Sequence, residues 1–173
     1  LKNFQYRNKG KIKKIDINLN ELNLNYLTNK KINQLSLIDT DIQTNMSSNK
    51  NSFKIQGKYS LNNNSFLSFE ILNKIQNELL NLELIADYDD HLELKILNYI
   101  KKKGEIAKIK LNLEKKKNSL KIIKLDINEN NNSFLLKDAK FFEGKILSLQ
   151  NLSVKTFKGE KKNNDFSILL NKN

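Results

Sequence analysis

Residues 107–127 read AKIKLNLEKKKNSLKIIKLDI and decide the fold. On both sides of the lysine-rich centre an apolar residue alternates with a polar one, as in Ile109, Leu111 and Leu113. A two-residue period places the apolar side chains of a strand on one face and the polar side chains on the other. Asn118 lies in the centre, where a tight turn needs a residue that tolerates positive φ. The stretch therefore predicts two antiparallel strands, each with one dry and one wet face.

The same alternation recurs along nearly the whole chain. Segments rich in Asn, Gly, Asp and Lys lie between the apolar runs and recur at intervals of roughly 8–14 residues, a spacing typical of consecutive antiparallel strands. We therefore expect an all-β chain in which a single domain, residues 1–173, forms a long antiparallel meander of about ten or more strands. The apolar runs are 15–19, 22–26, 53–61, 80–86, 92–96, 107–113, 125–127, 134–136, 147–149, 152–154 and 166–170, and the expected turns are 62–65, 87–90, 101–104, 115–118, 129–133, 143–144 and 159–165.

Residues 69–80 fit two interpretations. Phe69, Leu72, Ile75 and Leu79 have the spacing of one short helix near 69–80. The run 66–71 also fits a strand that ends at Asn73. Elsewhere the alternation slips by one residue, which predicts β-bulges that increase the twist of the sheet. These slips lie at residues 20–21, 96–97 and 122–123.

A sheet with one apolar face must hide that face from water. A helix layer, a second sheet, closure into a barrel or an apolar ligand can do so. The chain offers no convincing long amphipathic helix, which leaves a sandwich, a barrel, or a twisted, curled sheet with one hydrophobic face that forms an open groove. Such a groove would suit phospholipid acyl chains. The residues expected to line it are Leu82, Leu84, Leu92, Leu94, Ile109, Leu111, Leu125 and Ile127.

The charge of the chain is strongly positive, with 31 Lys and Arg against 19 Asp and Glu, a net +12. Arg7 is the only arginine, although arginine is favoured for reading bases, and single-strand binding favours aromatic platforms beside basic residues. The lysines are spread over strand faces and turns. A solvated surface is our first interpretation and contact with anionic lipid head groups the second. We do not expect a nucleic-acid partner.

The sequence offers few residues for catalysis or metal binding. Cysteine is absent, which excludes disulfides and thiolate chemistry. His91 is the only histidine and follows Asp87, Asp89 and Asp90, but this cluster lacks the spacing of a calcium loop and is more typical of a hydrogen-bonded turn. Glu83 and Glu93 alternate with leucines and should point to water. We expect no enzyme activity, no metal site and no cofactor.

The C-terminal half resembles a known family. Residues 80–127 (LNLELIADYDDHLELKILNYIKKKGEIAKIKLNLEKKKNSLKIIKLDI), 134–159 (FLLKDAKFFEGKILSLQNLSVKTFKG) and 163–170 (NNDFSILL) are similar to the repetitive β-rich periplasmic region of AsmA-like and TamB-like bacterial envelope proteins. The resemblance lies in strand lengths, short polar turns and the Gly-Lys, Leu-x-Leu-x-x-Leu-x-Val pattern of residues 144–154.

This resemblance implies a non-enzymatic, membrane-associated segment of a periplasmic protein. Its groove would shield lipid acyl chains in inner-to-outer membrane phospholipid transport or in outer-membrane biogenesis. It also implies an inner-membrane anchor in the parent protein, and no anchor is visible here. Because the chain begins at Leu1 and has neither an apolar run of about 18 residues nor a signal-peptide pattern, we expect a fragment of a longer chain. The alternative is a closed β-sandwich or barrel that serves as an interaction or adhesion module.

Overall fold

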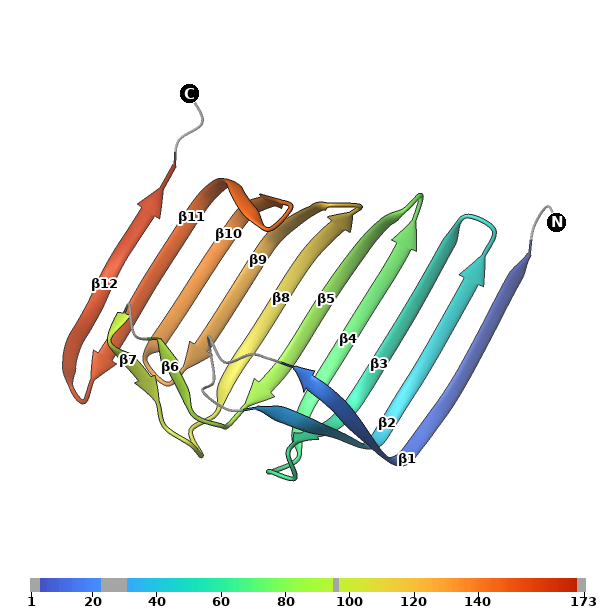
Figure 1. Cartoon of the computed structure of the whole chain (residues 1–173), viewed down its shortest axis with the longest axis horizontal. Coiled ribbons are helices and arrows are strands. Elements are labelled where there is room, and N and C mark those ends of the chain that lie inside the picture. Colours follow the sequence, from blue (N-terminus) through green and yellow to red (C-terminus); the bar gives the residue numbers. More distant parts are fainter. Residues whose placement is uncertain (1–3, 23–30, 95–96, 171–173) are drawn as a thin grey trace.

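A computed structural model describes residues 4–22, 31–94 and 97–170 of the chain. Ten of its strands form one antiparallel sheet in the order β1-β2-β3-β4-β5-β8-β9-β10-β11-β12, and β6 and β7 form a separate two-stranded sheet (Figure 1). The predicted all-β meander is therefore confirmed. The strands are β1 (Gln5–Leu22), β2 (Ile32–Ser47), β3 (Lys50–Leu61), β4 (Leu67–Gln76), β5 (Leu79–Tyr88), β6 (Leu92–Leu94), β7 (Tyr99–Lys101), β8 (Ala107–Lys116), β9 (Ser119–Glu129), β10 (Asn132–Phe142), β11 (Lys145–Lys158) and β12 (Lys161–Leu169).

The helix considered for residues 69–80 is wrong. Its first part lies in β4, and its last residues begin β5, which pairs with β4 from Phe69↔Ala86 to Gln76↔Leu79. Asn77 and Glu78 connect the two strands with positive φ angles of 50° and 62°, the conformation of a two-residue hairpin turn. The strand interpretation was correct but placed the end at Asn73, three residues short of Gln76. Tertiary pairing on both sides of β4 overrides the helical spacing of its apolar residues.

Two of the three predicted bulges lie where the alternation slips. The β1–β2 register shifts between Asn18 and Leu22, and the β8–β9 register shifts where Leu113 pairs with Ile122. The third slip, at residues 96–97, includes a residue outside the described ranges. Inside β2 and β10, Asp39 and Asp138 have positive φ angles of 46° and 48°. These irregularities increase the twist of the sheet and keep the apolar side chains on one face.

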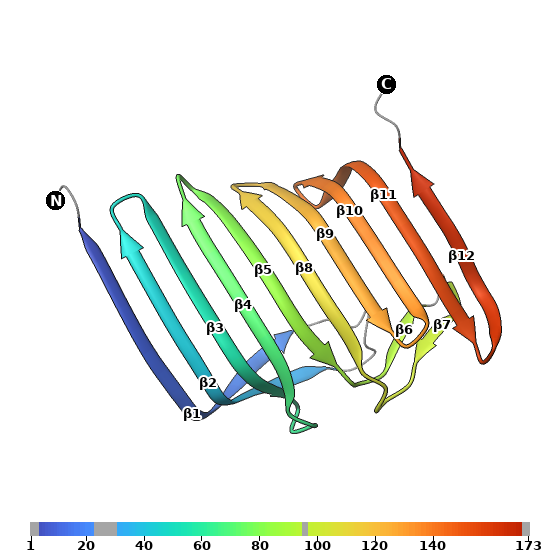
Figure 2. The same ribbon diagram turned by 180° about the vertical axis from the view of Figure 1, so that it is seen from behind.

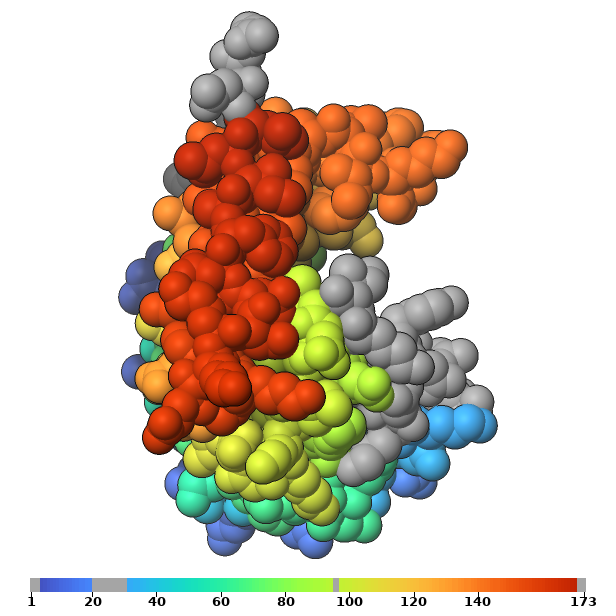
Figure 3. Space-filling view, turned by 90° about the vertical axis from the view of Figure 1, so that its left-hand side faces the viewer, coloured from blue at the N-terminus to red at the C-terminus, as the bar shows by residue number. Residues whose placement is uncertain are grey.

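The ten-stranded sheet is a single curved layer. The last part of β1 and the first part of β2 bend away from the sheet plane, and the β6–β7 hairpin lies on the same side, as the front and back views agree (Figures 1 and 2). Viewed from the β12 edge, the molecule has a C-shaped outline that encloses an open trough (Figure 3). Within the described residues β1 and β12 do not pair with each other, so neither the closed sandwich nor the closed barrel of our alternative is formed.

Few large side chains of this sheet are fully buried. Among the described residues, the buried hydrophobic ones are Ile32, Ala86, Tyr99, Ala107, Ala139 and Val154. A globular domain of this length normally hides its Leu, Ile and Phe side chains between two layers. In this chain most of them are half-buried, since among the described residues no complete second layer packs on the sheet. One face of the sheet therefore remains available to a ligand or partner.

Candidate functional site

The open trough is floored by a row of residues that the strand register aligns across the whole sheet. Each of the ten strands contributes one residue, and each residue is paired with the next. We call this the floor row. It consists of Gly10, Ile42, Ile55, Ile71, Leu84, Leu111, Leu125, Leu136, Leu152 and Ile168.

Two further rows flank the floor row on the same face, because residues two apart in a strand, or three apart across a bulge, point the same way. The first runs along the side of the trough where β6–β7 lies, and the second along the opposite side. Both are mainly apolar, so the trough has a continuous hydrophobic lining. The first consists of Gly57, Phe69, Ala86, Ile109, Ile127, Phe134, Val154 and Phe166, and the second of Phe53, Asn73, Leu82, Leu113, Ile122, Ala139 and Leu149.

The opposite, convex face of the sheet is polar. The aligned row next to the floor row contains Lys11, Asp41, Gln56, Glu70, Ile85, Lys110, Asp126, Leu135, Ser153 and Ser167. Ion pairs cross neighbouring strands there: Lys54 Nζ lies 2.8 Å from Glu70 Oε1, and Lys121 Nζ lies 3.0 Å from Asp138 Oδ1. The two faces thus differ as the alternation predicted, and much of the positive charge faces water.

Six of the eight groove residues predicted from the sequence lie together in this lining. Leu84, Leu111 and Leu125 belong to the floor row, and Leu82, Ile109 and Ile127 belong to the rows beside it; all six are half-buried. The other two, Leu92 and Leu94, lie in β6, opposite Lys101 and Tyr99 of β7, and therefore outside the main sheet. The sequence analysis left several members of the floor row out of the predicted groove; all but Ile42 lie in alternating runs that it recognised. These members are Ile42, Ile55, Ile71, Leu136, Leu152 and Ile168.

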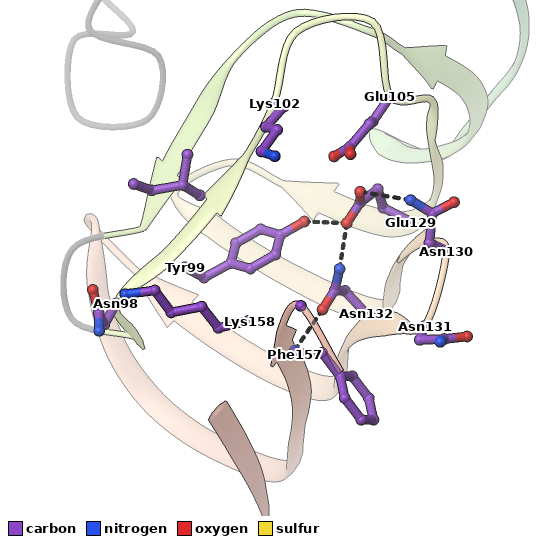
Figure 4. Close-up of a pocket in the computed structure, with 12 residues that line it drawn as sticks. Asn98, Tyr99, Lys102, Glu105, Glu129, Asn130, Asn131, Asn132, Phe157 and Lys158 are labelled. Carbon is purple, nitrogen blue, oxygen red and sulfur yellow. Dashed lines mark hydrogen bonds between the residues drawn. The ribbon is translucent and has the colours of Figure 1, made fainter. Parts of the chain in front are cut away.

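The β6–β7 hairpin forms a lip over one side of the trough. The Tyr99 ring packs on Phe134 with ring centroids 4.9 Å apart, which places the hairpin against the apolar face. The Tyr99 hydroxyl donates a 2.6 Å hydrogen bond to Glu129 Oε2 (Figure 4). From the β11–β12 side, Asn164 Nδ2 donates to Leu97 O at 2.6 Å and to Thr156 Oγ1 at 2.7 Å. The lip is therefore tied to strands far away in sequence.

Lys101 fastens the other end of the hairpin. Its side chain is completely buried, and its Nζ donates to Asp90 O at 2.9 Å and to Lys102 O at 3.1 Å. The ammonium also lies 5.3 Å from the centroid of the Tyr88 ring. Burial lowers the pKa of Lys101, while the carboxylates of Glu129 and Asp89 oppose that shift. The sequence analysis placed this lysine in an exposed turn, and only the tertiary structure reveals its role.

A polar cavity of about 510 Å³ opens between the hairpin and the turns at residues 130–131 and 159–160 (Figure 4). Glu129, which is 3% exposed, accepts hydrogen bonds from Tyr99, Asn130 and Asn132. Burial raises the pKa of Glu129, but these hydrogen bonds and the charge of Lys101 outweigh it, so the pKa lies below its ordinary value. Glu129 is thus a structural carboxylate and a poor general acid.

The acidic and histidine residues considered for metal binding form a turn. The backbone N–H of His91 donates a 2.8 Å hydrogen bond to Asp90 Oδ1, and the Tyr88 hydroxyl donates to His91 O at 3.1 Å. In the part of the chain that the structure describes, no three His, Cys, Asp or Glu side chains are grouped so that they could hold a metal ion. Glu83 and Glu93 lie in different sheets, on β5 and β6.

Comparisons with protein-family models, with curated proteins and with solved structures find no match to this chain. Within the described ranges, no helix has the length and apolar character needed to span a membrane. The functional interpretation therefore depends on the trough itself.

Asn73 interrupts the apolar lining. Its Oδ1 is buried and accepts no hydrogen bond from any described residue, while its strand neighbours on this face are Phe53 and Leu82. A buried, unsatisfied polar group costs about 1–3 kcal/mol. We therefore expect Asn73→Leu to raise the free energy of unfolding by about 1 kcal/mol in urea titrations. Asn112→Leu, on the convex face between Glu83 and Lys124, is the control and should change it little.

The raised pKa values of two tyrosines predict how the stability of the fold depends on pH. Burial, with the nearby negative charges, raises the pKa of Tyr59 and of Tyr88 from 10.0 to about 12. Because the folded state holds these protons more tightly than the unfolded state, their contribution is complete below pH 10 and is lost as the pH rises toward 12. Melting temperatures from circular dichroism should fall across this window. The fall should be smaller in a Tyr59→Phe/Tyr88→Phe variant, and an equal fall in both proteins would contradict the assignment.

Proposed function

We propose that this chain is a non-enzymatic segment of a cell-envelope protein whose apolar trough shields lipid acyl chains from water. The observation that carries the proposal is the floor row, which runs across all ten strands and over which the described residues form no complete second layer. Exposed apolar surface of this extent is rare in a protein without a partner and marks a binding site. An apolar chain bound along the trough would gain about 0.8 kcal/mol for each buried methylene group.

The dimensions of the trough suit an acyl chain. Strands in a sheet are about 4.8 Å apart, so a row across ten strands is about 43 Å long. The hydrocarbon core of a bilayer is about 30 Å thick, so one acyl chain extends over about 15 Å. The floor row could therefore hold a chain at several positions along its length, as a conduit requires. Its uniform side chains offer no reason for one position to be preferred.

The cellular role follows from the resemblance to AsmA-like and TamB-like proteins. It suggests that the groove contributes to inner-to-outer membrane phospholipid transport or to outer-membrane biogenesis. The location would be the periplasm, and the parent protein would be anchored in the inner membrane through a part outside this chain. The partners would be phospholipid acyl chains.

The test is whether the protein carries lipid. The protein should be purified without detergent, and its organic extract analysed for phospholipid by mass spectrometry, alongside native mass spectrometry of the intact protein. We expect bound phospholipid and saturable binding of a fluorescent fatty acid that phospholipid displaces. If the extract contains no lipid and the fluorescent fatty acid does not bind, the trough has another purpose.

A further inference from the structure

The two long rims of the trough differ in charge. The turns at residues 48–49, 77–78, 117–118 and 143–144 connect β2–β3, β4–β5, β8–β9 and β10–β11, and all four lie along the upper edge of the sheet in Figure 1. We call these turns, with two residues on each side, the upper rim. It contains five exposed lysines but only two acidic residues, Glu78 and Glu143. The lysines are Lys50, Lys115, Lys116, Lys117 and Lys145.

The opposite rim lacks this excess of positive charge. Its connections, as far as the structure describes them, bring acidic residues together with the lysines. The 3% exposed Glu129 and the buried Lys101 both take part in the polar contacts of the hairpin lip. Counted with two residues on each side, as for the upper rim, the described lower connections hold eight lysines and seven acidic residues. The lysines are Lys31, Lys101, Lys102, Lys103, Lys108, Lys158, Lys161 and Lys162, and the acidic residues are Asp87, Asp89, Asp90, Glu93, Glu105, Glu129 and Glu160. A negatively charged surface would therefore be attracted to the upper rim in preference to the lower one.

The most exposed apolar side chains of the sheet lie at the β10–β11 end of the upper rim and beside it. Ile146 and Leu147, at the tip of β10–β11, are each 67% exposed, and Leu169 and Leu170 beside them are 65% and 53% exposed. Leu147 and Leu170 line one cavity of about 370 Å³ together with Lys140 and the ion pair of Lys121 and Asp138. With the 46% exposed Phe142, these residues form what we call the apolar corner. In Figure 3 the β10–β11 tip projects from the body of the molecule.

We propose that the upper rim docks on an anionic lipid bilayer, with its lysines at the head groups and the apolar corner in the interfacial region. The surface of an anionic bilayer has negatively charged head groups outside and an apolar interior. The lysines of the upper rim match the head groups, and the exposed aliphatic side chains of the apolar corner match the apolar interior. A nucleic acid would neutralise the lysines but leave Ile146 and Leu147 in water, and Phe142 is the one aromatic ring that the corner offers for stacking on bases. Docking in this orientation brings one long side of the trough against the bilayer.

This proposal concerns a surface outside the trough and does not require that the trough bind lipid. The protein should be mixed with vesicles of phosphatidylcholine alone or with phosphatidylglycerol added, and bound protein separated by flotation. We expect flotation with the anionic vesicles and at least tenfold weaker binding to the neutral ones. Each lysine near an anionic surface contributes about a fivefold gain in affinity. A Lys115→Glu/Lys116→Glu/Lys117→Glu variant should therefore lose more than a hundredfold.

Matched variants distinguish docking by the upper rim from nonspecific binding to vesicles. Ile146→Asp/Leu147→Asp should weaken binding at least tenfold, whereas Ile100→Asp/Ile106→Asp should leave it unchanged, although Ile100 and Ile106 are 57% and 58% exposed. For the charge, Lys102→Glu/Lys103→Glu/Lys158→Glu on the lower rim is the control. Circular dichroism verifies that each variant is folded, and a folded upper-rim variant that binds like the wild type overturns the proposal.

Three further results would also overturn it: no flotation of the wild type with anionic vesicles, equal losses in upper-rim and control variants, or tight binding of a DNA duplex that the Ile146→Asp/Leu147→Asp variant retains. The last result would assign the lysines to a nucleic acid. Failure of the proposed function would give a different result. A protein that does not bind the fluorescent fatty acid would still float with the anionic vesicles.

Discussion

Replacing Gly57 by valine is expected to cost about 3 kcal/mol of stability or more, the upper range for a substitution that overfills a packed site. Gly57 lies in β3 opposite the bulge of β2 that contains Asp39 and Thr40. A Cβ atom at this position would lie 2.4 Å from Thr40 Oγ1, 2.7 Å from its Cα and 2.9 Å from its Cβ. Two of these three atoms are held by the backbone, so rotation of a side chain cannot relieve the clash.

The consequence extends beyond one contact because the sheet is a single layer. To admit the valine, β2 and β3 must separate, and no second sheet of the described residues holds β1 and β2 in place. We expect a lower urea midpoint and early loss of amide protection in β1–β3. Gly10→Val is the matched control: Gly10 is also in a strand, and nothing lies within 4 Å of a Cβ built there. Equal destabilisation by both variants would show that loss of glycine, and not the clash with Thr40, is the cause.

Leu111→Glu is expected to abolish acyl-chain binding while the protein stays folded. Leu111 occupies the middle of the floor row, between Leu84 and Leu125. An apolar chain that crosses this position would have to strip water from a carboxylate, which costs several kcal/mol when no partner replaces that water. Leu111 itself is only half-buried, so in the absence of a ligand the new carboxylate remains hydrated and folding is retained.

The measurement is the affinity for a fluorescent fatty acid, which should fall at least tenfold. Ile85→Glu is the control, since it introduces the same group on the convex face of the same strand pair, where Ile85 is 44% exposed and lies opposite Lys110. That variant should bind like the wild type. If Leu111→Glu binds the fatty acid as tightly as Ile85→Glu, acyl chains do not lie on the floor row.

The sequence predicted most strands of the main sheet because its signal is local, although none of the predicted runs covers β2 (Ile32–Ser47). Alternation such as Ile109, Leu111 and Leu113 assigns strands and faces, and the turns at residues 62–65, 115–118 and 143–144 were expected where hairpins occur. The β6–β7 hairpin escaped prediction for the opposite reason. Leu92 and Leu94 alternate with polar residues, as the apolar residues of the main sheet do. Contacts that the local pattern does not reveal hold the hairpin outside that sheet: Asn164 donates a hydrogen bond to Leu97 O, and the buried ammonium of Lys101 donates one to Asp90 O.

The groove could be predicted only in part. The alternation showed that one face is apolar, but it could not show which residues align across strands, because alignment depends on turn lengths and bulges. A prediction that overlooked the irregularity at Ile123 or at Asp39 would have assigned the remaining side chains of that strand to the wrong face of the sheet. The choice between an open and a closed sheet was also beyond local patterns, since it depends on the curvature accumulated over ten strands.

The order of strands gives the trough an adjustable length. Apart from β5 and β8, which flank the hairpin lip, every strand of the main sheet pairs with its neighbours in sequence. Such an assembly grows like a repeat protein, in which each unit contacts only the units beside it. Inserting or deleting one two-stranded hairpin would lengthen or shorten the trough by about 10 Å without disturbing the remaining pairs. Duplication of segments of about 20 residues would therefore change the length of the trough in steps of about 10 Å.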